Sequence, residues 1–250
     1  MDDAELWSEF LEFIERAPAA PHPGVLFEGF REELVSQGLP AELASEGAAH
    51  VREMSRDRSD WAAPMFDRIY TSDQAKFSAE PNEFVVRMIA DTPAGRALDV
   101  AMGQGRNAVH LARHGWDVTG FDVSEVGLAA ASRAATAAGT SLTAVRSTSE
   151  AFDYGTDAWD LVVVTYALVP VTAPAFVAMI ASALRPGGMV VIESFAVDGE
   201  QPSRPVDLDP DVLRIAYDSF FTVAFEREVV AADWTLQAVP IVRLAARRPG

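Results

Sequence analysis

Residues 97–107 constrain the fold more than any other part of the sequence. They read Ala-Leu-Asp-Val-Ala-Met-Gly-Gln-Gly-Arg-Asn, a short apolar run that contains an acid and continues into closely spaced small residues. The apolar run predicts a β-strand, and residues 105–114 predict a helix. Gly103 and Gly105 let the backbone approach a ligand where a Cβ would clash. The segment therefore predicts a strand–loop–helix unit in which the helix N-terminus offers free amide groups to an anion.

Strand-like and helix-like segments alternate from residue 97 onward, which is typical of an α/β fold with a doubly wound, mostly parallel sheet. The strands expected in this sheet are 97–101, 116–121, 142–146, 161–165 and 189–195. Residues 184–188, Leu-Arg-Pro-Gly-Gly, precede the last of them, and their glycines suit the geometry of a turn. Segments 222–230 and 236–244 are joined by a connection too short for a helical crossover, so we expect them to form an antiparallel C-terminal hairpin.

Three stretches of the first 60 residues carry apolar side chains at helical spacing. Breaks around Pro18–Pro23 and at Gly38 separate the stretches. We therefore expect a helical cap over residues 1–60 and the main domain over residues 61–250. The favoured interpretation is that the apolar stripes pack against the main domain, and the alternative is that the cap forms a lid over the site.

Composition excludes several classes of function. The formal net charge of -17 gives the surface a negative field that repels a phosphate backbone, so nucleic acid is not an expected partner. The chain has no cysteine, which excludes disulfides, thiolate zinc sites and a cysteine nucleophile. The first five residues are acidic where a signal peptide would be basic, and no apolar run approaches the roughly 20 residues that span a bilayer. A cytoplasmic protein without a membrane partner is expected, and the oligomeric state is not indicated.

The second predicted strand ends in Asp122, about 20 residues after the glycine-rich loop, where a carboxylate can accept hydrogen bonds from ribose hydroxyls. Both features suit an adenosine-containing cofactor. A dinucleotide fingerprint places glycine directly after the strand, whereas here Asp99 lies four residues before Gly103 and suits the ammonium of a methionine moiety. The pattern Gly103-x-Gly105-x-x-Ala108 still satisfies the looser dinucleotide motif, so an NAD-linked oxidoreductase remains an alternative.

From about residue 61 to its end, the chain resembles the class I S-adenosylmethionine (SAM)-dependent methyltransferases. The resemblance is strongest to the small-molecule branch, the tellurite-resistance and thiopurine types, in which Arg-Asn follows the first motif as Arg106-Asn107 does here. The family pattern is acid-x-Gly-x-Gly-x-Gly, and this sequence departs from it only at Ala101. The resemblance implies a Rossmann-like, seven-stranded sheet and SAM as the cofactor.

The resemblance also implies roles for individual residues. Asp122 matches the ribose-binding acid, and Thr148 stands where the family usually has an aspartate near the adenine. Tyr70 and Phe77 lie where related enzymes use N-terminal aromatic residues to close over SAM, although the favoured interpretation is that they only pack against their neighbours. The cofactor-binding set expected from the resemblance is Tyr70, Asp99, Ala101, Gly103, Gly105, Arg106, Asp122, Val123, Thr148, Ser149, Glu150 and Thr165.

In this family the reactive methyl group faces the loop after the fourth strand, here residues 164–168. Tyr166 is therefore the candidate catalytic residue, with a role in positioning the acceptor. The alternative is that Tyr166 only packs beneath the cofactor. The Asn/Asp-Pro-Pro-Tyr/Phe signature of amino-methylating DNA enzymes is absent there, and the four histidines are too dispersed to suggest a metal site. The sequence predicts methyl transfer from SAM to an oxygen, nitrogen or sulfur atom of a small molecule. A non-catalytic SAM-binding subunit or sensor is the main alternative.

Overall fold

The computed structural model of the chain describes residues 2–17, 23–55, 58, 60–72, 78–197, 206–231 and 238–250. By its internal contacts the chain divides into two compact units. The first consists of residues 1–76 with 123–126, and the second of residues 77–122 with 127–250. The domain boundary expected at residue 60 remains a prediction. No helix among the described residues is both long and apolar enough to cross a membrane.

The first unit is helical, and its first three helices are those expected from the sequence. Its helices are α1 (Asp3–Arg16), α2 (Pro23–Ser36), α3 (Ala41–Met54) and α4 (Ala62–Thr71). Helix α1 begins at a capping box, because the Asp2 carboxylate accepts hydrogen bonds from the amides of Ala4 and Glu5 while Glu5 accepts one from the Asp2 amide.

Aromatic side chains fill the interior of this helical unit. The Phe10 ring is fully buried and lies 5.5 Å from the Phe27 ring and 5.2 Å from the Phe30 ring. Trp61 closes the group, with its ring centroid 5.8 Å from that of Phe27. The apolar stripes at helical spacing are thus packing faces within the unit itself.

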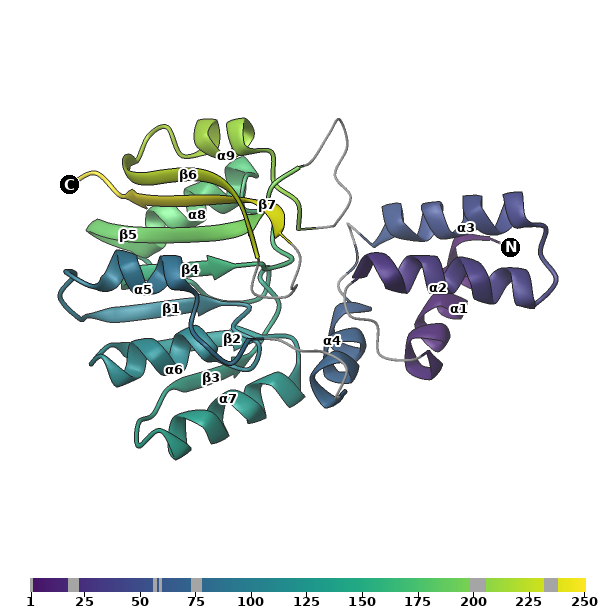
Figure 1. Cartoon of the computed structure of the whole chain (residues 1–250), viewed down its shortest axis with the longest axis horizontal. Coiled ribbons are helices and arrows are strands. Elements are labelled where there is room, and N and C mark those ends of the chain that lie inside the picture. Colours follow the sequence, from purple (N-terminus) through teal and green to yellow (C-terminus); the bar gives the residue numbers. More distant parts are fainter. Residues whose placement is uncertain are drawn as a thin grey trace. The chain divides into compact units, whose positions relative to one another are not determined.

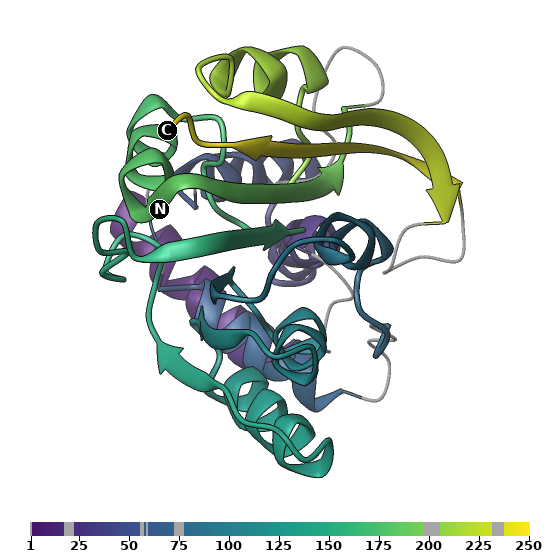
Figure 2. The same cartoon turned by 90° about the vertical axis from the view of Figure 1, so that its left-hand side faces the viewer.

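The second unit contains a seven-stranded sheet with the strand order β3-β2-β1-β4-β5-β7-β6 (Figure 1). The strands are β1 (Arg96–Val100), β2 (Asp117–Asp122), β3 (Thr143–Arg146), β4 (Trp159–Thr165), β5 (Leu184–Phe195), β6 (Phe221–Ala231) and β7 (Ala238–Arg247). The first five strands pair in parallel, and β7 pairs antiparallel with both β5 and β6. Figure 2 shows β6 and β7 side by side at the sheet edge. The predicted α/β fold with its C-terminal hairpin is confirmed.

Helices cover both faces of the sheet, as the alternation in the sequence predicts. The helices of this unit are α5 (Glu83–Ile89), α6 (Arg106–Arg113), α7 (Glu125–Ala137, from residue 127 onward), α8 (Pro174–Ala183) and α9 (Pro210–Ala216). Buried side chains of α5, α6 and α7 form one apolar core with one face of the strands, and those of α8 and α9 form a second core with the other face. The central strands β1 and β4 are therefore buried on both sides, which explains their nearly continuous apolar sequences, whereas the edge strand β3 is largely exposed.

The expected turn before the fifth strand differs from the structure. Strand β5 already begins at Leu184, which pairs with Trp159, and regular pairing resumes only at Met189 opposite Leu161. The intervening residues form a bulge inside the strand, where Gly187 has a φ of 78°. A Cβ on Gly188 would lie 2.9 Å from the Arg185 carbonyl oxygen, so this bulge requires glycine.

Candidate functional site

The predicted cofactor residues gather where the parallel strands end. Strand β1 lies between β2 and β4, so the chain winds to one side of β1 through β2 and β3 and to the other through β4 and β5. In open α/β sheets this reversal leaves a crevice outside the carboxyl ends of the strands, and ligands bind there. The loop after β1 and the end of β2 both reach this edge.

The loop between β1 and α6 has a left-handed backbone at every second residue. Ala101, Gly103 and Gly105 have φ values of 53°, 56° and 78°. Glycine adopts this conformation without strain, whereas a residue with a Cβ incurs a cost of about 1–2 kcal/mol. The alternating small residues in the sequence therefore reflect a backbone requirement, and Ala101 occupies a position that a glycine would fill without strain.

Gly105 also has no room for a side chain. A Cβ there would lie 2.6 Å from the Cβ of Ala131 in α7 and 3.1 Å from the Cα of the same residue. The amide of Gly105 donates to the carbonyl of Met102, which closes the loop directly before α6. Gly105 thus lets α6 start close to α7.

Asp99 provides an observation that tests the predicted cofactor. Its side chain is 2% exposed, and its Oδ2 atom is buried without a hydrogen-bond partner among the described residues. Burial raises the pKa of this carboxyl to about 7, against the opposing effects of the Arg106 charge and a hydrogen bond from the Ala108 amide. A buried carboxylate oxygen without a partner suits a cationic group, such as the ammonium of SAM.

Asp122 ties the end of β2 to this loop. Its Oδ2 atom accepts a hydrogen bond of 2.9 Å from the amide of Gly103. The charge of Asp122 also contributes to the raised pKa of Asp99, so the two carboxyl groups lie near one another. The loop residues and the two acids therefore form one cradle that fits an amino-acid cation together with a ribose.

Three further predicted residues have partners at this edge of the sheet. Arg106 donates a hydrogen bond of 3.4 Å to the carbonyl of Glu80. The hydroxyl of Thr165 accepts a hydrogen bond of 3.0 Å from Asn107, and the hydroxyl of Ser149 lies 3.0 Å from that of Tyr154. Their predicted roles toward the cofactor stay predictions.

The remaining residues of the predicted cofactor-binding set have few contacts that bear on cofactor binding. Thr148 accepts a 3.3 Å hydrogen bond from the amide of Ala151, and Glu150 is exposed. Tyr70 lies in α4 and Val123 in segment 123–126, both within the first unit. Phe77 lies outside the described residues. The structure therefore brings together the first-motif residues and Asp122, and it leaves the predicted roles of the other residues as predictions.

Tyr166 follows β4 in a conformation that is unusual for a bulky residue. Its φ is 52°, and its side chain is buried. Two hydrogen bonds to Glu193 hold it there: the Tyr166 amide donates to the Glu193 carbonyl at 2.9 Å, and the phenolic hydroxyl donates to Glu193 Oε1 at 2.7 Å. Strained residues of this kind are often found at functional sites.

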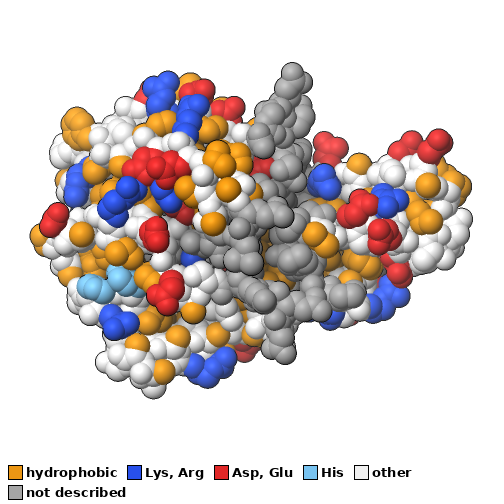
Figure 3. All heavy atoms as spheres, viewed as in Figure 1, with side chains coloured by type: hydrophobic (Ala, Val, Ile, Leu, Met, Phe, Trp, Pro, Cys, Tyr) orange, Lys and Arg blue, Asp and Glu red, His pale blue; other side chains and the backbone are white. Residues whose placement is uncertain are grey.

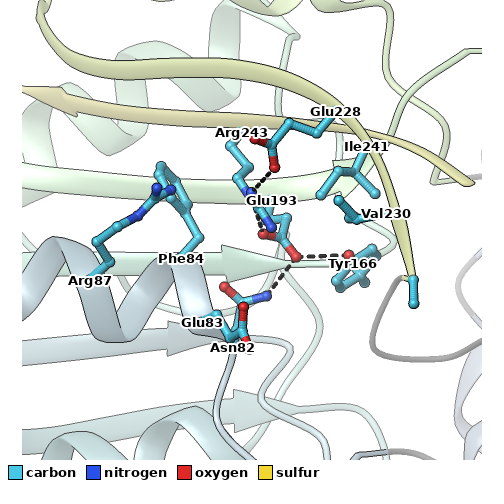
Figure 4. A pocket seen from close by; sticks show the side chains of 11 residues that line it. Asn82, Glu83, Phe84, Arg87, Tyr166, Glu193, Glu228, Val230, Ile241 and Arg243 are labelled. Carbon is cyan, nitrogen blue, oxygen red and sulfur yellow. Dashed lines mark hydrogen bonds and ion pairs between the residues drawn. The ribbon is translucent and has the colours of Figure 1, made fainter. Parts of the chain in front are cut away.

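Glu193 is the site residue that the sequence analysis missed. Its carboxylate accepts hydrogen bonds from Tyr166, from Asn82 Nδ2 at 2.6 Å and from Arg243 Nε at 2.6 Å (Figure 4). Thr165, Glu193, Arg243 and Glu226 face one another across four adjacent strands in one row of the sheet. A polar stripe thus crosses an otherwise apolar face of the sheet.

A sequence signal for this stripe does exist. Glu193 is an acid within the apolar strand β5, and Arg243 is a base within β7, whose neighbouring residues Val242 and Leu244 are buried. Buried charges are rare unless they are paired, so an acid in one buried strand predicts a base nearby. The pairing partner could not be identified because the register between β5 and β7 is not visible in the sequence.

A cavity of about 410 Å³ opens beside Tyr166 and Glu193 (Figure 4). Its volume falls within the range of small-molecule pockets. The lining residues come from the start of α5, the end of β4 and strands β5, β6 and β7: Asn82, Glu83, Phe84, Arg87, Tyr166, Glu193, Glu228, Val230, Ala231, Ile241 and Arg243. Across the described part of the chain, no three acidic, histidine or cysteine side chains are grouped to hold a metal ion.

The chain matches the methyltransferase-domain family over residues 97–188, which run from β1 into β5. No curated protein sequence matches the chain.

Many solved structures share its fold. The 1,6-didemethyltoxoflavin-N1-methyltransferase of Burkholderia thailandensis is 20% identical, with 80% of this chain and 90% of that chain covered and a TM-score of 0.57. The N-methyltransferase NodS of Bradyrhizobium japonicum is 19% identical, with coverages of 66% and 93% and a TM-score of 0.55. TehB of Haemophilus influenzae is 17% identical, with coverages of 74% and 66% and a TM-score of 0.55.

The family match covers the loop that carries Asp99, Gly103 and Gly105, and the mostly parallel seven-stranded sheet with its C-terminal hairpin is the fold expected from the sequence. The predicted enzyme class and the predicted cofactor, SAM, are therefore confirmed, and the NAD-linked alternative is set aside. The chain carries a class I SAM-dependent methyltransferase domain.

Proposed function

We propose that the protein transfers a methyl group from SAM to an oxygen, nitrogen or sulfur atom of a small molecule that binds in the cavity beside Tyr166. The observation that carries this proposal is the cavity itself, which is of small-molecule size and lies against the residue that follows β4. Its lining combines an apolar wall with charged and amide side chains that can orient a polar group of the acceptor. The apolar and aromatic residues are Phe84, Tyr166, Val230, Ala231 and Ile241, and the charged and amide residues are Asn82, Glu83, Arg87, Glu193, Glu228 and Arg243.

The chain's own residues account for cofactor binding in this proposal. Asp99 would pair with the ammonium of SAM, the glycine loop would admit its backbone, and Asp122 would accept hydrogen bonds from the ribose hydroxyls. The bound cofactor supplies a methyl group on a sulfonium sulfur, which is open to attack by a nucleophile. Tyr166 would hold the acceptor in place, because orienting two reactants can supply much of the rate acceleration.

The charge of the molecule favours a small acceptor over nucleic acid. The formal net charge is -17, and acidic and basic side chains are interspersed on the face of the second unit shown in Figure 3. A phosphate backbone gains affinity from clustered Lys and Arg side chains, whereas the blue side chains visible on that face lie among red ones. Among the structural relatives, the Burkholderia enzyme holds 1,6-didemethyltoxoflavin together with S-adenosylhomocysteine. This relative supports the proposal of a small-molecule acceptor.

The first experiment is calorimetric titration with SAM, S-adenosylhomocysteine and NAD. We expect the first two to bind and NAD not to bind, and we expect Asp122→Ala to weaken both affinities by at least about tenfold through the lost ribose contacts. Binding of NAD alone would contradict the proposal.

The second experiment separates an enzyme with a small-molecule acceptor from a SAM-binding sensor. The protein is incubated with SAM and pools of small amines, phenols and thiols, and formation of S-adenosylhomocysteine is followed. Acceptor-dependent product that falls in Tyr166→Phe supports the proposal. Tight SAM binding without turnover on any pool would instead favour the sensor.

A further inference from the structure

The hydrogen-bond directions around Glu193 are fixed by the chemistry of its partners. Arg243 can only donate, and its Nε lies 2.6 Å from Glu193 Oε2. The Asn82 side-chain oxygen already accepts from the amide of Val85 at the start of α5, so its Nδ2 group must face Glu193 Oε1. With donors on both oxygens and an arginine beside it, Glu193 acts as a hydrogen-bond acceptor.

Tyr166 therefore gives its single hydroxyl hydrogen to Glu193. The distance from the phenolic oxygen to Glu193 Oε1 is 2.7 Å, which is short and typical of a bond to a charged acceptor. The hydroxyl has one hydrogen and two lone pairs, so it can offer only its oxygen to any other group. Toward a ligand in the cavity, Tyr166 is a hydrogen-bond acceptor.

The charged residues around the cavity also disfavour a ligand that brings only acceptor groups or a negative charge. Among its described lining residues, three are acidic (Glu83, Glu193 and Glu228) and two are basic (Arg87 and Arg243). Arg87 pairs with Glu226 at 2.7 Å, and Arg243 contacts Glu193, Glu228 and Glu226 within 3.3 Å. Both guanidinium groups already pair with carboxylates, and the lining carboxylates outnumber them. The surroundings of the cavity are therefore net negative and disfavour an anionic ligand.

We propose that Glu193 is the positioning residue that sets acceptor specificity. By holding the Tyr166 hydroxyl as a hydrogen-bond acceptor, it makes the cavity select uncharged or cationic molecules that offer an N–H or O–H group, and reject carboxylates and molecules with acceptor atoms only. This inference rests on the proposed function for the identity of the cavity as the acceptor site. The preference of the cavity for hydrogen-bond donors can nevertheless be measured by binding alone, without turnover.

The test uses four aromatic probes of similar size in NMR titrations, with and without S-adenosylhomocysteine. Indole offers an N–H group, 1-methylindole lacks it, quinoline has only an acceptor nitrogen, and indole-2-carboxylate is anionic. In the wild-type protein we expect indole to bind roughly tenfold more tightly than each of the other three, the effect of one hydrogen bond to a partly charged network.

Two variants assign the selectivity to the pair of residues. Glu193→Gln removes the charge that holds the Tyr166 hydrogen, and its amide nitrogen must face a donor, either Asn82 Nδ2 or Arg243 Nε. The altered network no longer holds the hydroxyl hydrogen away from the cavity, so the preference should shift by about tenfold from indole toward quinoline. Tyr166→Phe keeps the ion pair between Glu193 and Arg243 and should bind indole and 1-methylindole equally. This second variant tests the inference even if Glu193→Gln does not fold.

Asp160→Asn is the matched control. Asp160 also pairs with an arginine, with Arg185 Nη1 at 2.8 Å, but it lies at the opposite end of β4. We expect Asp160→Asn to prefer indole as strongly as the wild-type protein does. A change of preference in Glu193→Gln alone would then not be a general effect of losing an ion pair.

Three results would overturn the inference: equal wild-type affinities or no binding of any probe, an unchanged preference in Glu193→Gln, or tightest binding of indole-2-carboxylate. Failure of the proposed function would show separately, as absent SAM binding in calorimetry or absent turnover on the acceptor pools.

Discussion

The buried Asp99 carboxyl lowers the stability of the fold when it is ionised. Its proposed role, pairing with the ammonium of SAM, explains this cost. Its buried carboxyl has a pKa of about 7, above its ordinary value of 3.8. A group whose pKa is raised in the folded state stabilises the fold fully only below its unfolded pKa, and this contribution is lost as the pH rises through 7. By this linkage, ionised Asp99 lowers the free energy of unfolding at pH 8 by on the order of 4 kcal/mol.

We therefore expect Asp99→Asn to stabilise the cofactor-free protein, with a gain of about 1–2 kcal/mol at pH 5 that grows to about 4 kcal/mol at pH 8. The same variant should bind SAM at least about tenfold more weakly, because it lacks the charge that pairs with the ammonium. Urea unfolding at the two pH values and calorimetry with SAM provide the measurements. A variant that is less stable than the wild-type protein at pH 8, or that keeps full affinity for SAM, would contradict this explanation.

Much of the predicted cofactor site could be identified from the sequence, whereas the residues around the acceptor cavity could not. Asp99 and Gly103 lie close together in sequence, and the loop geometry that requires them is local. Glu193 and Arg243 are 50 positions apart, and their contact depends on the antiparallel register of β5 and β7. Local patterns carry no information on that register, so the pair that orients Tyr166 could only be found in the structure.

At the scale of elements, the packing of α6 against α7 depends on Gly105, which has no side chain. Gly105→Ala would add both a strained left-handed φ and a Cβ within 2.6 Å of the Ala131 Cβ. We expect the free energy of unfolding to fall by about 2–5 kcal/mol, with weaker SAM binding because the loop must shift. Urea unfolding measures the first effect and calorimetry the second.

Gly139→Ala is the control for this prediction. Gly139 has a similar φ of 71°, but a Cβ there would have no atom within 4 Å. Its cost should therefore be only the backbone strain, about 1 kcal/mol. Equal losses in the two variants would mean that the contact with Ala131 contributes nothing.

The order and type of the elements followed from the alternation of apolar patterns, because each pattern is set by burial of one or two faces. The segment from Leu184 to Gly188 did not follow, since its Pro-Gly-Gly composition suits a turn. The flanking pairs with Trp159 and Leu161 keep it inside β5 as a bulge. Here tertiary pairing overrides the local turn preference.

At the scale of the whole molecule, each unit has its own apolar interior. The aromatic residues around Phe10 and Phe30 fill the helical unit, whereas Val163, Val191 and their neighbours fill the unit that contains the sheet. Regions with separate cores can open in separate steps, each with its own free energy. The protein is therefore expected to show two groups of amides with different protection from hydrogen exchange.

Phe10→Ala tests this expectation. Removing a fully buried aromatic ring should lower the stability of the helical unit by about 3–5 kcal/mol. Hydrogen-exchange mass spectrometry should then show faster exchange in α1, α2 and α3, with unchanged exchange in β1 and β4. The reciprocal variant Phe176→Ala removes a buried ring of α8 and should accelerate exchange around the sheet while it leaves α1–α3 unchanged. Faster exchange throughout the chain in both variants would mean that the two cores unfold as one cooperative structure.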